Sequence, residues 1–308
     1  MSMSDRQIVK IIREICEENN ISFKLYCYDW VMQLEINNKS VYIFGYQFQN
    51  NSAPAHLICE DKSALSEILE QHNIRAVKHH FFMCPSGRHH IGTHDCWTEL
   101  IGLLDKYGSV VCKRNDGTGG NEVYKAETRH ELEIAIDALF KTNRSVAVSP
   151  YYDIETEYRV IILDGGAELV YSKERMFVEG TGVDDMQQLI IKKYGTSVNL
   201  LAVDKKLDYN IILEKGEKYN LTWKHNLAKG AEPIILHDEK ERERLTDIAL
   251  SAAAVTGINF ASVDIIKTVR GEYLILEINS GIMMEQFAKH SEENYITAKK
   301  IYKKALKI

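Results

Sequence analysis

A β-hairpin is predicted for the stretch Ser262-Val-Asp-Ile-Ile-Lys-Thr-Val-Arg-Gly-Glu-Tyr-Leu-Ile-Leu-Glu-Ile-Asn-Ser280, which has apolar residues in both halves and a turn at Arg270-Gly271. If the hairpin closes on that turn, Asp264 lies directly opposite Glu277 on the neighbouring strand. Side chains alternate between the faces of a strand, so Glu277 and Asn279 share one face and Asp264 joins them there. The stretch therefore predicts two carboxylates and an amide oxygen on one face of a sheet.

Two interpretations of this hairpin are open. Like charges directly opposed on a sheet are destabilising unless a cation lies between them, and hard oxygen ligands suit Mg²⁺ bridged to phosphates. Alternatively, the acids are ordinary residues on a solvated strand face, and a register shift of one residue would separate them. The hairpin alone does not decide between a metal site and an acidic surface strand.

A second informative segment is the strand–loop–strand run Val110-Val-Cys-Lys-Arg-Asn-Asp-Gly-Thr-Gly-Gly-Asn-Glu-Val-Tyr124. Gly117, Gly119 and Gly120 lack side chains, as a backbone that closes over phosphates requires. Lys113 stands just before the loop, where an ammonium group can meet a phosphate oxygen. The segment is neither a P-loop, because no Gly-Lys-Ser/Thr follows, nor a Rossmann fingerprint, because no helix follows. Taken alone, it fits a glycine-rich hairpin turn as well as a lid over a nucleotide.

The rest of the chain mixes helices with antiparallel strands. Helices are predicted, from apolar residues at helical spacing, over residues 5–18, 61–72, 97–106, 128–140 and 239–255, with a basic helix at the C-terminus. Strands are predicted over 23–28, 31–36, 41–44, 77–83, 109–113, 146–148, 158–163, 167–171, 261–266 and 273–278. Asp61 can cap its helix, and Thr128 with Glu131 forms a capping-box pattern. Because many strands are joined by short turns, we expect an α+β fold rather than a repeated βαβ series.

The composition excludes several classes of protein. The chain has 308 residues, of which 45% are hydrophobic and 27% charged, as is typical of soluble globular proteins. The net charge of -6 argues against general nucleic-acid binding, which needs a basic surface. No apolar run is long enough to cross a bilayer, and the first residues do not look like a signal peptide. The six cysteines include no CxxC pair, so we expect reduced thiols and a cytoplasmic protein with no nucleic-acid or membrane partner.

Taken in order, these features resemble the ATP-grasp superfamily over residues 55–286. The resemblance rests on an ordered series rather than on one motif: Asp61-Lys62, Lys113, Asp116–Gly120, Glu157-Tyr158-Arg159-Val160, Arg175, His225–Gly230, and the set Asp264, Glu277 and Asn279. It implies an ATP-grasp fold of the α+β class, with two α+β lobes gripping ATP and a short α/β N-terminal lobe. The boundaries it suggests are 1–60 for the N-terminal lobe, 61–150 for the lobe with the glycine-rich lid, and 151–308 for the lobe with the metal site.

Within the superfamily, the chain is most similar to the ligase modules of glutathione synthesis and of cyanophycin synthetase, with the ribosomal-protein glutamate ligases nearby. Residues 175–190 resemble a turn-plus-helix insert of those modules. Two segments depart from the pattern. The hinge, Ser149-Pro150-Tyr151-Tyr152, lacks a common glutamate, and Asn279 is followed by Ser-Gly-Ile-Met-Met-Glu where many relatives have Ser-Pro-Gly. The second departure leaves the acceptor substrate open.

The resemblance also implies site residues. The metal ligands would be Asp264, Glu277 and Asn279, holding Mg²⁺ or Mn²⁺ in its place. The residues that would bind ATP are Lys62, Lys113, Gly117, Thr118, Gly119 and Gly120 for the phosphates, Ser149, Tyr151 and Tyr152 at the adenine hinge, and Asp153 or Glu155 for the ribose. The catalytic residues would be Arg159, Arg175, Lys224 and Asn226, with Asn226 and Lys224 holding the acyl phosphate and the oxyanion. Two simpler readings stay open: Arg159 pairs only with neighbours of Glu157, and Lys224 is solvated.

The activity implied is a ligase reaction in two steps. A substrate carboxylate attacks the γ-phosphate of ATP to give an acyl phosphate and ADP, and an amine then displaces phosphate. The substrates would be small-molecule or peptide carboxylates and amines, and a homo-oligomer is compatible with this expectation. The alternatives are an ATP-grasp phosphotransferase that acts on a small molecule, and a nucleotide-binding module without catalysis.

Two further features carry weaker signals. Histidines and cysteines crowd residues 77–96, namely His79, His80, Cys84, His89, His90, His94 and Cys96. The spacing His90-x-x-x-His94 is compatible with zinc but matches no standard framework, so a polar loop that touches substrate or phosphate is the favoured interpretation. The C-terminal lysines, from Lys299 to Lys307, are typical of a solvated helix end, and no partner is expected for them.

Overall fold

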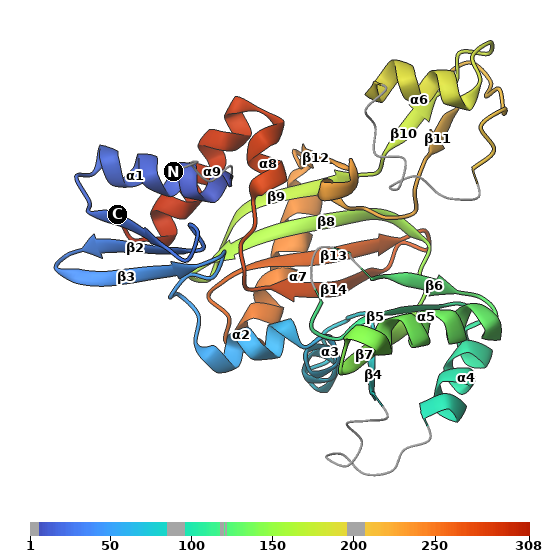
Figure 1. Ribbon diagram of the computed structural model, residues 1–308, viewed down its shortest axis with the longest axis horizontal. Helices are drawn as coiled ribbons and strands as arrows, with labels where there is room; N and C mark the ends of the chain where they lie inside the picture. Colours follow the sequence, from blue (N-terminus) through green and yellow to red (C-terminus); the bar gives the residue numbers. More distant parts are fainter. Residues whose placement is uncertain (1–5, 85–95, 118–119, 121, 196–206) are drawn as a thin grey trace. The chain divides into compact units, whose positions relative to one another are not determined.

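The computed structural model describes residues 6–84, 96–117, 120, 122–195 and 207–308. The chain divides into two compact units: unit 1 comprises Met1–Val170 with Leu236–Ile308, and unit 2 comprises Tyr171–Ile235 (Figure 1). The predicted boundaries at residues 60 and 150 both fall inside unit 1 and stay a prediction. No helix of the described part has the length and apolar character that a membrane span requires.

The N-terminal part of unit 1 combines helix α1 (Gln7–Glu18) with the antiparallel strands β1 (Phe23–Tyr26), β2 (Val31–Ile36) and β3 (Lys39–Phe44). The predicted apolar face of α1 is buried, as expected from its helical spacing. Asn37 and Asn38 both have positive φ, the conformation of a two-residue hairpin turn. Helix α1 packs against α8 (Glu285–His290) and α9 (Glu292–Ala305), so the two ends of the chain lie side by side (Figure 1).

The basic C-terminal helix has partners that the sequence did not predict. Lys299 Nζ donates to Glu14 at 2.9 Å and to Glu18 at 2.7 Å, and both acids lie on α1. At the other end of the interface, the Glu285 carboxylate accepts the backbone N–H groups of Gln7 and Ile8 at 2.7 and 3.0 Å. The first backbone N–H groups of a helix have no acceptor within the helix, and the Glu285 carboxylate supplies one for α1. The expectation of a merely solvated lysine run is therefore wrong for Lys299.

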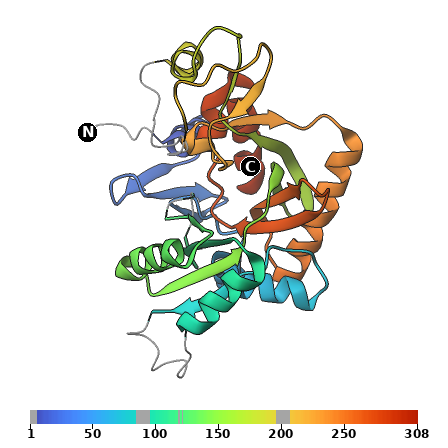
Figure 2. The ribbon, with the colours of Figure 1, turned by 90° about the vertical axis from the view of Figure 1, so that its right-hand side faces the viewer.

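A four-stranded sheet with the order β4-β7-β5-β6 forms the next layer of unit 1. Its strands are β4 (His80–Met83), β5 (Val110–Arg114), β6 (Tyr124–Ala126) and β7 (Ser145–Pro150). Helices α4 (Cys96–Tyr107) and α5 (Arg129–Thr142) pack on it around a core that includes Leu100, Leu132 and Val148 (Figure 2). The predicted capping box at the start of α5 is present, between Thr128 and Glu131.

Three neighbouring strands of a five-stranded sheet position the site. They are β8 (Ile154–Leu163), β13 (Phe260–Thr268) and β14 (Tyr273–Asn279), with β13 pairing antiparallel to both of the others. Helices α2 (Ala53–Glu60), α3 (Lys62–Gln71) and α7 (Glu239–Thr256) contribute to the core that covers one face of these strands (Figure 1). The core includes Val160, Val263 and Ala249. The mixture of helices with antiparallel sheets confirms the predicted α+β class.

Unit 2 is a small α+β body of its own. The chain enters it within β9 (Gly166–Glu174), whose end pairs antiparallel with β12 (Glu232–Ile235). A second pair, β10 (Phe177–Glu179) with β11 (Lys218–Asn220), is accompanied by helix α6 (Met186–Tyr194). A short 3-10 helix, Leu227–Lys229, precedes β12. The core of unit 2 includes Met176, Met186 and Leu221.

Two of the differences between the predicted elements and the structure concern the segments before the four-stranded sheet. Helix α2 was missed, although Ser52 caps it by accepting from the backbone of Ala55, and its first turn contains Pro54. The strand predicted over 77–83 is shorter, since only His80–Met83 belongs to the four-stranded sheet. Val77 instead donates its backbone N–H to Ile275 on β14. Such long-range pairing cannot be read from local periodicity.

Candidate functional site

The predicted pairing of Asp264 with Glu277 is confirmed, but the predicted register is wrong by one residue nearer the turn, where Lys267 pairs with Tyr273. Asp264 pairs with Glu277, and Ser262 with Asn279, while the turn contains Gly271 with positive φ. Between Asp264 and Ile265 the register shifts, which marks a β-bulge beside the acidic pair. On its other side, Asp264 pairs with Arg159 of β8. The cross-strand row is therefore Arg159, Asp264 and Glu277, on three adjacent strands.

Alternation separates this row from the hydrophobic core. Tyr158, Val160, Val263 and Ile278 pack into the cluster that contains residues of α7. Their neighbours in the row point to the opposite face of the sheet. Asp264 is only 1% exposed. The interpretation as a solvated strand face is therefore wrong for this residue, whose carboxylate needs compensation inside the protein.

Arg159 supplies part of that compensation. Its Nε donates to Asp264 Oδ1 at 2.7 Å and its Nη2 donates to Oδ2 at 2.6 Å, a bidentate pair. The simpler reading, in which Arg159 pairs only with neighbours of Glu157, is thus wrong. The sequence predicted Arg159 as a site residue but not this partner, because the contact depends on the pairing of two strands about a hundred positions apart in the chain.

Glu277 faces a different set of groups. Its Oε1 accepts from Asn279 Nδ2 at 3.0 Å, and its Oε2 lies 3.8 Å from Lys62 Nζ. Lys62 begins helix α3, directly after Asp61, whose side chain accepts the backbone N–H of Ala64 as predicted. The Lys62 side chain is buried, and its Nζ also donates to the carbonyl of Gly117. Lys62 thus brings the head of α3, the acidic hairpin and the glycine-rich loop together.

Lys113 is the second buried lysine near this row. It lies in β5 and is 8% exposed. Burial lowers the pKa of its ammonium group to about 8, while the nearby carboxylates of Glu277 and Glu157 oppose that shift. Within the described part of the chain Lys113 makes no salt bridge, and a buried lysine of this kind suits a ligand that brings its own negative charge.

The glycine-rich loop is anchored by a residue that the sequence did not single out. Asn115 is 1% exposed, and its Oδ1 accepts from the backbone and the hydroxyl of Ser63 at 3.2 and 2.8 Å. A Cβ at Gly117 would stand 2.8 Å from the Cβ of Arg114, so this glycine is needed for space. Gly120 has the positive φ that glycine favours. The predicted residues Thr118 and Gly119 lie outside the described part of the chain.

The predicted adenine hinge follows strand β7. Ser149 is buried in that strand, and Tyr151 N–H donates to the carbonyl of Ser109 at 3.0 Å. The Tyr152 ring packs beside a small apolar cluster of Val77, Ile266 and Leu274. Ile266 lies on the same face of β13 as Asp264, two residues away. The hinge therefore leads to an apolar surface next to the acidic row.

The two candidates for ribose binding differ in their surroundings. Glu155 Oε1 accepts from Lys267 Nζ at 2.9 Å, an exposed pair at the end of the sheet. Asp153 lies at the turn between β7 and β8, where its carbonyl accepts the backbone N–H of Val269 at 3.0 Å. Its carboxylate has no ion pair of this kind among the described residues.

His79 is a further group at this place. It is buried, and its Nε2 has no hydrogen-bond partner within the described residues. Burial holds the pKa of its imidazole well below the usual range, and the charges of Lys113 and Lys62 lower it further. The sequence marked His79 only as part of a histidine-rich run. Of that run, His89, His90 and His94 lie outside the described residues, and the described residues contain no group of three His, Cys, Asp or Glu side chains able to hold a metal.

The donor set on the sheet fits magnesium in a particular way. Asp264, Glu277 and Asn279 offer two carboxylates and an amide, too few for a closed cage of protein ligands. Mg²⁺ usually binds through one or two carboxylates and takes its other ligands from phosphates and water. The opposed pair Asp264 and Glu277 is the chemistry that such an ion requires, and Lys62 and Lys113 match the phosphates that accompany it.

The remaining predicted catalytic residues belong to unit 2. Asn226 Oδ1 accepts the backbone N–H of Ala228 at 2.8 Å and so caps the short 3-10 helix. Lys224 is half-buried, which lowers the pKa of its ammonium group to about 8, with a further contribution from Lys229. A fully solvated Lys224 is therefore wrong. Arg175 follows β9 and lies close enough to His225 to lower the pKa of that imidazole.

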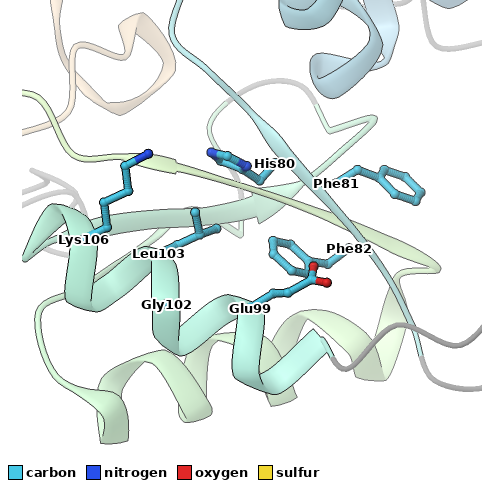
Figure 3. Close-up of a pocket in the computed structure, with 7 residues that line it drawn as sticks. All are labelled: His80, Phe81, Phe82, Glu99, Gly102, Leu103 and Lys106. Atoms are coloured by element: carbon cyan, nitrogen blue, oxygen red, sulfur yellow. The ribbon is translucent and has the colours of Figure 1, made fainter.

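A cavity of about 390 Å³ lies elsewhere, between β4 and α4 (Figure 3). His80, Phe81 and Phe82 line it from the strand, and Glu99, Gly102, Leu103 and Lys106 line it from the helix. The Phe82 side chain points toward α4 while Phe81 points away. None of the residues predicted to bind ATP or metal lines this cavity, so it is separate from the acidic row.

The buried histidines predict a loss of stability in mild acid. Burial lowers the pKa of His225 from 6.5 to about 4, although its Nδ1 contact with the Lys173 carbonyl opposes the shift. The unfolded chain protonates this imidazole near pH 6.5 whereas the folded protein does not, so stability is fully present above pH 6.5 and falls as pH drops toward 4. The loss reaches about 1.4 kcal/mol per pH unit. We expect urea unfolding to show this slope, and His225→Gln to reduce it.

The matched control for that experiment is His72→Gln, because His72 is exposed. It should leave the slope between pH 6.5 and pH 4 unchanged. An identical slope in the wild type and in His225→Gln would contradict the assignment of a buried neutral imidazole.

Comparison with known proteins finds a family model and relatives in the ATP-grasp group. The sequence model of the RimK-like ATP-grasp domain matches residues 185–304. Ribosomal protein bS6–L-glutamate ligase from Escherichia fergusonii is 29% identical over 189 residues, covering 61% of this chain and 48% of that protein. The chain thus spans about half the length of that curated relative.

Two solved structures share the fold. A bifunctional glutathione synthetase from Pasteurella multocida aligns with a TM-score of 0.58 at 16% identity, over 96% of this chain and 44% of that one. A D-alanine–D-alanine ligase from Bacillus anthracis aligns with a TM-score of 0.54 at 17% identity, over 82% of this chain and 68% of that one. At such identities the likeness shows the fold. The chain therefore has the ATP-grasp fold, and its residues 185–304 are similar to a RimK-like ATP-grasp domain.

Proposed function

We propose that this chain is an ATP-dependent ligase that activates a substrate carboxylate as an acyl phosphate and joins it to an amine. The observation that carries the proposal is the row on the sheet, where Asp264 and Glu277 oppose each other between Arg159 and Lys62. Buried Lys113 adds a second lysine, for which the described residues show no salt bridge at hydrogen-bond distance. The similarity to a protein named as a glutamate ligase supports the same reaction class.

The protein's main task in this reaction is positioning and charge compensation. Lys62 and Lys113 would bind phosphate oxygens of ATP, because both ammonium groups are buried beside the acidic row. Asp264, Glu277 and Asn279 would hold Mg²⁺, or Mn²⁺ in its place, which supplies Lewis-acid polarisation of the phosphate when bound. Phosphoryl transfer needs little covalent chemistry from the protein, so fixed charges at these positions are the relevant contribution.

Adenine binding is proposed for the hinge. The apolar cluster of Tyr152, Val77, Ile266 and Leu274 suits one face of a base. The backbone of Ser149 and Tyr151 would supply polar contacts to the edge of that base. For the ribose hydroxyls we favour Asp153 over Glu155, because Glu155 is engaged by Lys267. Thr118, Gly119 and Gly120 are proposed to close over the phosphates as part of the glycine-rich loop.

The roles of the residues in unit 2 follow the family resemblance. Arg175 is proposed to act on the transferred phosphoryl group, and Lys224 with Asn226 on the acyl phosphate. In the first step the substrate carboxylate oxygen attacks the γ-phosphorus, and the bond from that phosphorus to the β–γ bridging oxygen breaks. In the second step the amine nitrogen attacks the acyl carbon, phosphate leaves with its electron pair, and the nitrogen loses a proton. The half-buried Lys224 suits the developing oxyanion.

The proposal is tested by incubating the purified chain with ATP, Mg²⁺ and pairs of amino acids or short peptides. We expect equal amounts of ADP and phosphate, released only when both a carboxylate and an amine are present, with an amide product detected by mass spectrometry. A stable phosphorylated product without phosphate release would show a phosphotransferase instead. If the chain also fails to bind ATP in equilibrium dialysis, the proposed function is overturned.

A further inference from the structure

The candidate metal ligands already face cations that belong to the protein. Arg159 binds both oxygens of Asp264, whose side chain is 2% exposed, through hydrogen bonds of 2.7 and 2.6 Å. Glu277 is less tightly held, because Lys62 Nζ stands 3.8 Å away and the Glu277 side chain is 20% exposed. The two carboxylates therefore differ. Asp264 is enclosed and fully engaged, whereas Glu277 retains access to solvent.

We infer that Arg159 is the resident counter-cation of the metal site: it neutralises Asp264 in the metal-free protein, and a divalent cation must compete with it for that carboxylate. The inference rests on the proposed function, because it takes Asp264 as a metal ligand. It adds that Arg159 acts on the metal through Asp264, as a positioning residue.

Charge and geometry both support this role. A buried carboxylate without a partner is strongly unfavourable, so the fold needs a cation beside Asp264 whether or not metal is present. The planar guanidinium engages the two carboxylate oxygens in parallel, the geometry in which Arg binds most specifically. A divalent ion that arrives alone would meet this positive charge. An ion that arrives with ATP belongs to a complex of net negative charge, which offsets this repulsion, so the site favours metal and nucleotide together.

The strand register explains why this task falls to Arg159. Arg159, Asp264 and Glu277 occupy directly opposed positions on β8, β13 and β14. The row contains one cation, Arg159, and two acids, and Lys62 Nζ from helix α3 lies 3.8 Å from Glu277 Oε2. Removal of Arg159 leaves Asp264 and Glu277 opposed and takes away the bidentate hydrogen bonds to Asp264. That arrangement demands another cation at the same place.

The experiment compares Arg159→Met with the wild type in the absence of nucleotide. Thermal unfolding is followed in EDTA and across a titration with MnCl₂, and Mn²⁺ binding is measured by electron paramagnetic resonance. For the wild type we expect a melting temperature that is insensitive to Mn²⁺ and weak binding of the bare ion. For Arg159→Met we expect a lower melting temperature in EDTA, recovery with Mn²⁺, and Mn²⁺ binding tighter by at least about tenfold, since one adjacent positive charge is gone.

Two further variants keep the result interpretable. The double variant Arg159→Met with Asp264→Asn removes the pair together, so it should fold in EDTA and lose its response to Mn²⁺ even if the single variant does not fold without metal. Lys267→Met removes an exposed ion pair between β13 and Glu155, near the other end of β8. It should behave as the wild type does in the Mn²⁺ titration.

The inference is overturned if Arg159→Met melts at the same temperature with and without Mn²⁺, or if the wild type binds the bare ion as tightly as the variant. Binding of ATP with Mg²⁺ to the wild type is measured beside these titrations. If the wild type binds that complex while Arg159→Met shows no response to metal, the inference about Arg159 fails and the proposed function stands. If the wild type does not bind the complex, the proposed function fails.

Discussion

Glu277→Gln is expected to reduce ATP-dependent turnover by about 10³-fold or more while the protein stays folded, since a lost metal ligand removes several kcal/mol of charge stabilisation and each 1.4 kcal/mol corresponds to a factor of ten. The substitution keeps the size of the side chain and an oxygen that can accept from Asn279 Nδ2. It removes one of two opposed negative charges but also a carboxylate near Lys62 and Lys113, and these opposing effects should leave the metal-free protein folded. The measurements are phosphate release at saturating ATP and the melting temperature.

A matched control exists on the same hairpin. Glu272 lies just before β14 and makes an exposed ion pair with Arg75 at 3.5 Å. Glu272→Gln changes the net charge equally, but an exposed pair contributes little and does not belong to the acidic row. It should retain full turnover. Wild-type turnover in Glu277→Gln, or an equal loss in Glu272→Gln, would refute the metal role of Glu277.

Local chemistry made parts of this fold predictable. The capping box of Thr128 and Glu131 and the cap at Asp61 are set by side chains within three residues of the backbone that they bind. The pairing of Asp264 with Glu277 was also predicted from the hairpin pattern, although the β-bulge that brings these two residues opposite each other was not. These features depend on neighbours in the chain, and the structure confirms them.

Features that depend on contacts between segments far apart in the chain could not be predicted from the sequence. The bidentate contact between Arg159 and Asp264 requires β8 to lie beside β13, and nothing local to either strand specifies that neighbour. The anchor between Asn115 and Ser63 likewise joins a loop to a helix head far away in the chain. The burial of His79 depends on a segment that leaves its predicted strand to contact β14. The family resemblance identified Arg159 as a site residue, but only the fold shows what it binds.

Asp264 links these two kinds of information. Its position opposite Glu277 comes from the hairpin, whereas its exposure of 1% comes from the packing of three strands. The pairing with Glu277 is compatible with a metal site. The burial of Asp264 requires a positive charge beside its carboxylate. Together they explain why the same row contains a guanidinium.

Lys113→Met is expected to lower the affinity for ATP by about 10²-fold, the upper range for the loss of a hydrogen bond to a charged group. The methionine side chain has a similar length and no charge, and burying it should not destabilise the fold, because desolvation already opposes the ammonium group. ATP affinity is measured by isothermal titration. Lys78→Met is the control, because Lys78 is exposed and paired with Glu70 at 2.9 Å. The assignment is contradicted if Lys113→Met binds ATP as the wild type does.

The pH dependence of binding tests the same residue without a substitution. The pKa of Lys113 is about 8 in the free protein, because burial lowers it from 10.5. A lysine bound to phosphate keeps its proton, so binding above pH 8 requires proton uptake and the affinity should fall about tenfold per pH unit.

Unfolding of the protein cannot cause this loss of affinity. The Lys113 ammonium group keeps its proton up to about pH 10.5 in the unfolded chain, so raising the pH from 8 to 10.5 stabilises the fold with respect to this group. Glu277 raises the pKa of Lys113, so in Glu277→Gln the fall in ATP affinity should begin at a lower pH. Constant wild-type affinity between about pH 7 and about pH 9 would exclude Lys113 as a phosphate ligand.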